Sequence, residues 1–231
     1  MYKRILLKIS GEALGGKENA IDPCRVEHVV NQLVALHKHG LDIAVVVGGG
    51  NFWRGRQGTN MNRVTADHMG MIATVMNALA LQDAIEKKGV DTRVQTALNI
   101  PAVAEPFILR KALRHFEEKR IVIFACGTGN PYFSTDSGAA LRAAEIKADI
   151  LLMAKNIDGL YDSDPKKNKN AKKLDFASYR EVLDKRLQLM DLTAITMCME
   201  NNIPILAFGL NDGDNLTRAA LGEKVGTKIG N

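Results

Sequence analysis

Four segments of this 231-residue sequence combine glycines, hydroxyl groups and charged side chains in patterns suited to binding a phosphorylated ligand. The first is Lys8–Glu12 (KISGE), in which a lysine precedes a turn that contains serine and glycine. An ammonium group and the backbone N–H groups of such a turn can contact a phosphate chain. A surface lysine before an ordinary turn would give the same short pattern, so this segment alone does not establish a site.

Three consecutive glycines, Gly48–Gly50, form the second segment and are followed by Asn51 and Arg54. Glycine lets the backbone approach a ligand closely, and successive N–H groups can form an anion-binding nest. The Arg54 guanidinium can then bind a phosphate through two parallel hydrogen bonds. A flexible turn is the alternative, although three glycines lose conformational entropy that an ordinary turn need not lose.

The third segment, Gly127–Asp136 (GTGNPYFSTD), is dense in glycine and hydroxyl groups and precedes an expected helix, whose N-terminus favours anions. Thr135 or Asp136 alone can be read as a helix N-cap, but the loop is longer than a cap requires. The fourth segment, Lys155–Pro165, offers the ring of Tyr161 and several carboxylates, which suit a nucleoside. A surface turn around Asp-Pro is the alternative for this segment.

Apolar runs of strand length alternate with helix-period segments along the chain, which predicts an α/β fold with a mainly parallel sheet. The expected strands are Arg4–Ile9, Asp42–Val47, Thr92–Gln95, Ile121–Ala125, Ile150–Ala154, Ile203–Phe208 and a short C-terminal strand. The expected helices are Cys24–His39, Thr65–Lys88, Ile108–Glu118, Ser137–Lys147, a short helix opened by the capping box Ser178-x-x-Glu181, Asp191–Glu200 and Asn215–Leu221. All four segments follow expected strands, and open parallel sheets bind ligands where their strands end.

The sequence also supports expectations about one helix cap, one helix face and the domain organisation. Asp22 and Pro23 predict an N-cap and first residue for the first helix. In the helix that starts near Thr65, the apolar side chains at helical spacing are expected to face the core: Met69, Ile72, Met76, Leu79 and Ala80. The segment Lys155–Ala177 has no regular periodicity and is expected to be a long loop. No change in composition marks a domain boundary within residues 1–231, so a single domain is expected.

Composition argues against several functional classes. The net charge of +5 is mild, and no basic block carries interleaved aromatic residues, so no nucleic-acid partner is expected. Apolar runs are far shorter than a membrane span and no leader is visible, so we expect no membrane contact and a cytoplasmic location. The three cysteines are scattered and the five histidines lack metal spacing, which predicts free thiols and no metal ligated by His or Cys. There is also no GxxxxGK[ST], GxGxxG or GxSxG motif. The residues alone therefore indicate an α/β protein with nucleotide-binding loops and phosphoryl-transfer chemistry.

Together the segments resemble the amino acid kinase superfamily and, within it, the bacterial uridylate kinases. The resemblance is carried by KISGEAL (Lys8–Leu14), VVGGGNFWRG (Val46–Gly55), ADHMGMIATVMN (Ala66–Asn77), GTGNPYFSTDSGAALRAAEI (Gly127–Ile146) and KNIDGLYDSDP (Lys155–Pro165). Other members of the superfamily share the first lysine and the glycines, but not DHMGM together with GTGNPYFSTD.

The resemblance implies an open αβα sandwich that transfers the γ-phosphate of ATP to UMP, giving UDP and ADP in pyrimidine nucleotide biosynthesis. It implies catalytic roles for Lys8, Arg54 and Asp136. The resemblance implies that ATP is bound by Lys8, Ile9, Ser10, Gly11, Gly50, Arg54, Asn156, Tyr161 and Asp164. It implies that UMP is bound by Gly49, Asp67, Thr128, Gly129, Asn130, Pro131, Tyr132, Phe133, Ser134 and Thr135, with Asp67 accepting hydrogen bonds from the ribose. The implied cofactor is Mg²⁺, held mainly by the phosphates with Asp136 nearby.

The resemblance further implies a homohexamer and the nucleotide effectors GTP and UTP. The loop Gly15–Ala20 is shorter than its counterpart in many relatives, which argues against activation by GTP. The compact KNIDG segment leaves the roles of Lys155 and Asn156 open. Two alternatives remain: an amino acid kinase that acts on a carboxylate or carbamate, and a non-catalytic nucleotide-binding protein on the same fold. DHMGM and GTGNPYFSTD argue against the first, and the joint presence of Lys8, Arg54 and Asp136 argues against the second.

Overall fold

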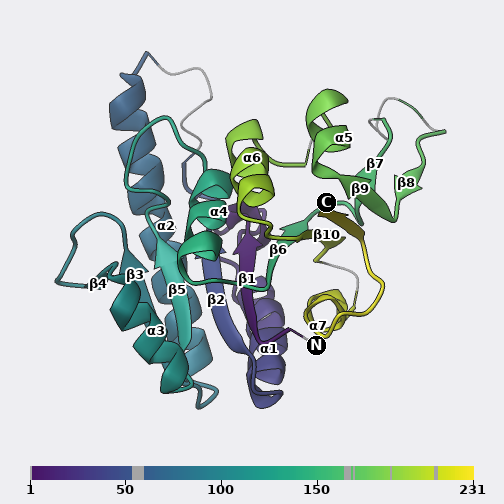
Figure 1. Ribbon diagram of the computed structural model, residues 1–231. Coiled ribbons are helices and arrows are strands. Elements are labelled where there is room, and N and C mark those ends of the chain that lie inside the picture. The colour runs from purple at the N-terminus through teal and green to yellow at the C-terminus, as the bar shows by residue number, and fades with distance from the viewer. Residues whose placement is uncertain (1, 54–59, 164–167, 169, 188, 211–212) are drawn as a thin grey trace.

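A nine-stranded sheet runs through both halves of the described chain, in the order β4-β3-β5-β2-β1-β6-β10-β11-β9 (Figure 1). The computed structural model describes residues 2–53, 60–163, 168, 170–187, 189–210 and 213–231. The strands are β1 (Arg4–Ile9), β2 (Asp42–Val47), β3 (Thr92–Thr96), β4 (Glu105–Pro106), β5 (Ile121–Ala125), β6 (Ile150–Lys155), β9 (Phe176–Ser178), β10 (Ile205–Gly209) and β11 (Thr227–Gly230). Only β10 and β11 pair in antiparallel fashion in this sheet as described, so it is mainly parallel, as predicted.

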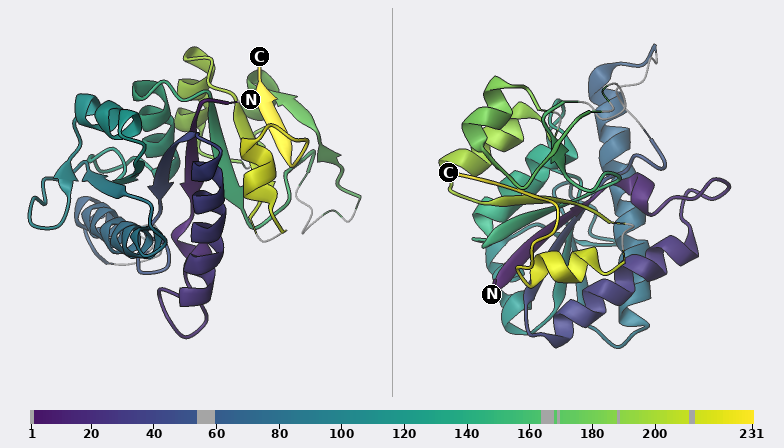
Figure 2. Two further views of the ribbon diagram at one scale, coloured as in Figure 1. Left: turned by 90° about the horizontal axis from the view of Figure 1, so that it is seen from below. Right: turned by 90° about the vertical axis from the view of Figure 1, so that its right-hand side faces the viewer.

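Helices cover both faces of the sheet (Figure 2). One face carries α1 (Pro23–Lys38), α2 (Arg63–Glu86) and α7 (Asn215–Ala220), while the other carries α3 (Leu109–Glu117), α4 (Thr135–Glu145), α5 (Tyr179–Asp184) and α6 (Leu192–Glu200). In β1, Ile5, Leu7 and Ile9 belong to the first core and Leu6 to the second, as expected when a strand is buried on both sides. The predicted αβα sandwich is confirmed.

Two helix starts predicted from a capping side chain are confirmed. Asp22 accepts hydrogen bonds from the backbone N–H groups of Cys24 and Arg25, and Pro23 is the first residue of α1. The capping box of Ser178 and Glu181 opens α5. The described part of the chain has no helix that is both long and apolar enough to cross a bilayer.

The start of α2 was predicted wrongly. The helix begins at Arg63, and Asn62 is its cap, accepting from the N–H of Val64. The apolar periodicity of the sequence begins only after Asn62, so it does not reveal this cap. Asp67 therefore lies in the second turn, where the helix dipole stabilises a carboxylate less than in the first.

The predicted core face of α2 was also wrong. Met69, Ile72 and Met76 are 37%, 52% and 43% exposed. The buried face of this helix instead mixes small, polar and larger apolar side chains: Ala66, Met71, Ala73, Thr74, Val75, Asn77, Ala78, Leu81 and Ile85. Apolar side chains surround this helix, so their spacing does not single out the buried face.

The segment after β6 is more regular than its sequence suggested. β7 (Leu160–Tyr161) and β8 (Lys173–Leu174) form an antiparallel hairpin, and β9 follows directly. The predicted C-terminal strand is confirmed as β11, which pairs with both β10 and β9.

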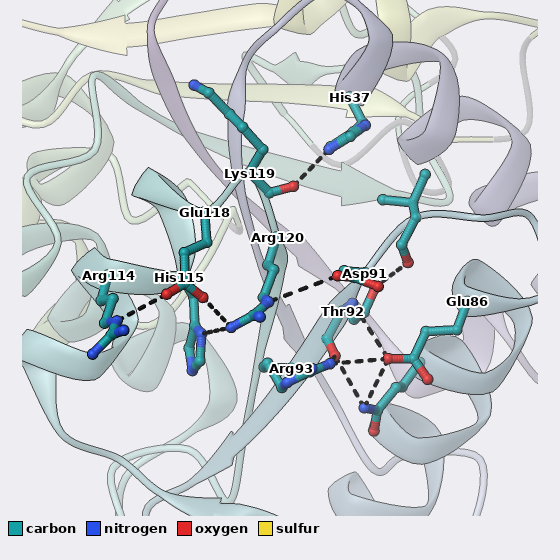
Figure 3. Close-up of polar contacts among 12 residues, drawn as sticks. His37, Glu86, Asp91, Thr92, Arg93, Arg114, His115, Glu118, Lys119 and Arg120 are labelled. Carbon is teal, nitrogen blue, oxygen red and sulfur yellow. Dashed lines mark hydrogen bonds and ion pairs between the residues drawn. The ribbon is translucent and has the colours of Figure 1, made fainter.

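Polar side chains brace the edge of the sheet where β3 and β5 begin (Figure 3). Arg120 pairs with Glu118 and donates to the Nδ1 atom of His115 at 3.2 Å, while Arg93 donates to Glu86 of α2 at 3.2 Å. Such partly exposed pairs contribute about 0–1 kcal/mol each, so their effect is mainly local order. The longer, glycine-rich loops lie at the opposite edge, where these strands end.

Candidate active site

An ion pair joins the end of β1 to the first turn of α4. The Nζ atom of Lys8 lies 2.6 Å from an Oδ1 atom of Asp136, and both side chains are largely buried. Lys8 leaves β1 on the same face as Leu6, which is the face that α4 covers. Two of the three residues that the sequence assigned to catalysis are thus in direct contact. The third, Arg54, lies outside the described residues.

Ser134 is the N-cap of α4. Its hydroxyl oxygen accepts from the backbone N–H groups of Asp136 at 3.0 Å and Ser137 at 3.3 Å. The alternative reading of Thr135 or Asp136 as the cap of this helix is excluded, because both lie inside it. With Ser134 as cap, Asp136 presents its carboxylate to Lys8.

A second buried lysine lies at the same place. Lys8 pairs with Met153 in the β1–β6 register, so Lys155 leaves β6 two residues farther on and on the same face. The Nζ atom of Lys155 donates to the carbonyl oxygen of Leu189. Burial lowers the pKa of the Lys155 ammonium, the Asp136 carboxylate raises it, and the charge of Lys8 lowers it further. Two ammonium groups around one carboxylate favour an anionic ligand.

The glycines near this centre are needed for close packing of the backbone. A Cβ atom on Gly11 would lie 2.7 Å from the carbonyl oxygen of Gly48, and one on Gly49 would lie 2.8 Å from the Cβ of Ala73. Gly48, Gly49 and Gly50 do not adopt left-handed backbone conformations. The loops after β1 and β2 therefore lie against each other and against α2 more closely than any side chain would allow.

Two asparagines hold this glycine loop, and the sequence reasoning did not identify their role. Asn77 is fully buried and donates to the carbonyl oxygen of Gly48 at 2.7 Å and to Asn51 at 2.8 Å. Asn51 also donates to the carbonyl oxygen of Ala20 at 2.6 Å. A polar residue inside the apolar run of α2 was the available signal, since buried amides normally satisfy their hydrogen bonds within the protein.

A cavity of about 290 Å³ opens beside the glycine loop, between α2 and the loop before α4. Its lining includes these residues of the predicted acceptor set: Gly49, Asp67, Thr128, Asn130, Phe133, Ser134 and Thr135. Gly129, Pro131 and Tyr132 of the same set are not in this lining. Gly129 instead packs against Ala97, while the Tyr132 ring is 65% exposed and lies 5.3 Å from the Arg63 guanidinium.

Asp67 already has protein partners in this cavity. Its carboxylate accepts from the backbone N–H of Tyr132 at 2.7 Å and from the Nε atom of Arg63 at 2.8 Å. Asp67 therefore links α2 to the loop before α4, and a ligand hydroxyl would share or replace these contacts. The sequence did not identify Arg63, although its i,i+4 spacing to Asp67 favours such a pair.

The loop before α4 has an unusual backbone. Cys126, Gly127, Gly129 and Tyr132 all have positive φ, at 64°, 54°, 79° and 73°. Such conformations are costly for Cys and Tyr and persist only where surrounding contacts hold them. One such contact is the hydrogen bond from the N–H of Cys126 to the buried hydroxyl of Thr74, at 2.7 Å.

A second cavity, of about 530 Å³, lies on the other side of Gly50, which lines both. Of the predicted donor set, Gly50 and Asn156 line this second cavity. The side chain of Ile9 is fully buried in the core, so only its backbone can reach a ligand. The Tyr161 hydroxyl donates to Asp158 at 2.7 Å, which lowers the pKa of that carboxyl and raises the pKa of the Tyr161 phenol. Asp164 lies outside the described residues.

Comparison with known proteins supports one family. The amino acid kinase family matches residues 3–208. The chain is 37% identical to a UMP kinase from Bacillus anthracis, with a TM-score of 0.96 over 99% of this chain and 96% of that one. It is 36% identical to a UMP kinase from Ureaplasma parvum, with a TM-score of 0.94 over all of both chains. A uridylate kinase from Archaeoglobus fulgidus is 25% identical, with a TM-score of 0.74 over 97% of this chain and 99% of that one.

The Thr74 hydroxyl offers a test of how the strained loop is held. Thr74→Val keeps the shape but leaves the buried N–H of Cys126 without an acceptor, so unfolding free energy should fall by about 1–3 kcal/mol in urea denaturation. Thr74→Ser keeps the hydroxyl and is the matched control, with a smaller loss. Equal stability of Thr74→Val and the wild-type protein would show that the loop does not depend on this hydrogen bond.

Proposed function

The chain belongs to the amino acid kinase family, and on that premise we propose that it is a UMP kinase, which transfers the γ-phosphate of ATP to UMP. The observation that carries this proposal is the Lys8–Asp136 ion pair at the carboxyl edge of the sheet. Two cavities open beside the glycine loop that follows β2, and Gly50 lines both. The solved relatives described above carry the same activity in their names, over nearly the full length of the chain.

We assign the smaller cavity to UMP and the larger to ATP. The smaller cavity is bounded by the GTGNPYFSTD loop and by Asp67, the segments that distinguish uridylate kinases in the sequence. The larger cavity faces the turn after β1 and includes Asn156. Ser10, Gly11 and the backbone of Ile9 then contact the ATP phosphates, Tyr161 and Asp164 the nucleoside of ATP, and Arg54 the transferring group.

Phosphoryl transfer depends on alignment and charge neutralisation more than on covalent catalysis. The UMP phosphate is already a nucleophile, so no strong general base is required. Lys8 neutralises charge that develops on the transferring phosphoryl group, and Asp136 orients the Lys8 ammonium through their 2.6 Å contact. The Lys155 ammonium adds positive charge close to Asp136. No covalent enzyme intermediate is needed.

We propose Mg²⁺ as the cofactor, bound with ATP. Mg²⁺ keeps several waters and is usually held by one or two carboxylates together with substrate phosphates. Asp136 supplies a carboxylate of this kind beside the expected phosphate position, so the donor chemistry fits. When bound, the ion would offset the negative charge of the phosphate groups.

The alternatives in this family differ in their acceptor. A carboxylate or carbamate kinase has no need of a carboxylate for ribose hydroxyls, such as Asp67 in the wall of the smaller cavity. A non-catalytic nucleotide-binding protein has no need of an ion pair of largely buried charges such as Lys8–Asp136. Both observations favour UMP kinase activity.

A coupled assay of ADP release tests the proposal. With ATP and Mg²⁺, UMP should be phosphorylated with strong preference over CMP and AMP, and acetylglutamate and carbamate should give no turnover. Equal rates with CMP and UMP would contradict the uridylate assignment while leaving the family unaffected.

The exposed side of α2 supports assembly. Val64, Met69, Ile72 and Met76 form an apolar surface along this helix, and such surfaces mark contacts between proteins. We propose that it packs against a second copy within the homohexamer that the resemblance implies. Light scattering that finds only monomers would contradict this assembly.

The remaining proposals rest on the resemblance and on general features of the chain. Cys24, Cys126 and Cys198 are free thiols, as predicted, which suits a cytoplasmic location. One sheet runs through both halves of the chain, which supports a single domain over residues 1–231. We propose UTP as an effector; the short loop Gly15–Ala20 argues against GTP.

Asp67→Asn separates a ribose contact from a purely structural link. Asn can still accept from the N–H of Tyr132, so thermal stability should change little. Without the carboxylate, charge-assisted acceptance from ribose hydroxyls is lost, and KM for UMP should rise about tenfold or more while KM for ATP is nearly unchanged. Asp83→Asn on the same helix removes an exposed i,i+4 pair with Lys87 and is the matched control, with normal kinetics. An unchanged KM for UMP beside a lowered melting temperature would make Asp67 a structural residue only.

A further inference from the structure

Asp191, at the start of α6, makes more hydrogen bonds than a helix cap needs. Its Oδ1 atom accepts from the N–H of Ala194 at 2.9 Å, which is the capping contact. The carboxylate also accepts from the hydroxyl of Ser137, with 3.0 Å and 3.1 Å to its two oxygens, and from the hydroxyl of Ser134. Asp191 therefore joins the first turn of α6 to the first turn of α4.

The hydrogen bond from Ser134 to Asp191 has a fixed direction. A serine hydroxyl has one proton to donate and two lone pairs to accept with. Both lone pairs of Ser134 are used by the N–H groups of Asp136 and Ser137. Its proton therefore goes to Asp191, and only a side chain that accepts at this position can complete the arrangement.

The same short segment also contacts the second buried lysine. Leu189, two residues before Asp191, accepts a hydrogen bond from the Nζ atom of Lys155 through its carbonyl oxygen. The chain at and just before the start of α6 thus contacts both the cap of α4 and Lys155. Both partners are linked to Asp136: Ser134 caps the helix turn that holds it, and Lys155 interacts with its carboxylate, which pairs with Lys8.

We propose that Asp191 is a positioning residue for phosphoryl transfer. It holds the Ser134 hydroxyl so that the first turn of α4 presents Asp136 to Lys8 and Thr135 to the acceptor cavity. It acts through Ser134 and does not contact the substrates. The role rests on the proposed UMP kinase function, because it concerns the alignment of that reaction centre.

Asp191→Asn distinguishes this role from simple capping. Asn is as good a helix N-cap as Asp, so the capping of α6 is preserved. The Asn amide keeps one accepting oxygen, which the N–H of Ala194 and the Ser137 hydroxyl can use. Its NH₂ group, however, faces a Ser134 oxygen that has no lone pair left, and the Ser134 proton loses its acceptor.

The experiment compares the wild-type protein, Asp191→Asn, Ser134→Ala and the double variant, each as the full chain. We expect Asp191→Asn to lower kcat about 10- to 100-fold, because a small misplacement of reacting groups can cost about this much in rate. KM for ATP should be nearly unchanged. The contact between Ser134 and Asp191 is only partly buried, so its loss should lower the melting temperature only slightly. Asp22→Asn makes the same chemical change at the cap of α1 and is the matched control, with normal kcat.

The double variant tests whether Asp191 acts through Ser134. Removing the Ser134 hydroxyl also removes the proton that lacks an acceptor, so the double variant should be no slower than Ser134→Ala alone. The proposal would be overturned if the two single substitutions reduced kcat independently, so that their effects multiplied in the double variant. It would also be overturned if Asp191→Asn had wild-type kcat, whether or not its melting temperature fell. A wild-type protein that does not phosphorylate UMP would overturn the proposed function, and this inference with it.

Discussion

Lys8 and Asp136 place opposite charges close together where little water reaches them. The desolvation cost of such a pair can exceed the attraction between its members, so burial of this kind is a poor route to stability. The position of the pair explains its burial better. Lys8, at the end of the central strand β1, is held by a carboxylate at the N-terminus of α4, which packs on the same face of the sheet. Much of the surrounding structure keeps the Lys8 ammonium and the Asp136 carboxylate aligned with each other.

This alignment depends on backbone contacts that are too close to leave room for side chains. Gly11, Gly48 and Gly49 let the loops after β1 and β2 lie against each other and against α2. Asn77 holds the same loop by hydrogen bonds from inside α2. On the other side, Ser134 and Asp191 define where α4 begins. The reaction centre is thus held from both faces of the sheet, and its loops are more constrained than their glycine content suggests.

The sequence predicted the alternation of strands and helices because each buried strand is a nearly continuous apolar run and most helix ends carry a recognisable cap. It also predicted that Lys8 and Asp136 belong to one site, through motifs rather than through spacing. It failed on α2, whose apolar residues surround the helix, so that Ile72 and Met76 were expected in the core but are exposed. It also missed the role of Arg63, although its i,i+4 spacing to Asp67 favours a pair. The roles of Asn77 and Asp191 were missed because their partners are distant in the chain.

The central claim is that the Lys8 ammonium stabilises the transferring phosphoryl group, and Lys8→Ala tests it most directly. Calorimetric titration should show UMP affinity close to that of the wild-type protein, because Lys8 is assigned to the donor phosphates. The rate constant kcat should fall by roughly a hundredfold, the typical effect of losing one group that stabilises transition-state charge. Circular dichroism of the same sample would establish that the variant is folded. A folded variant with near-normal kcat would contradict the account, because the reaction would then not depend on the charge around which the site is built.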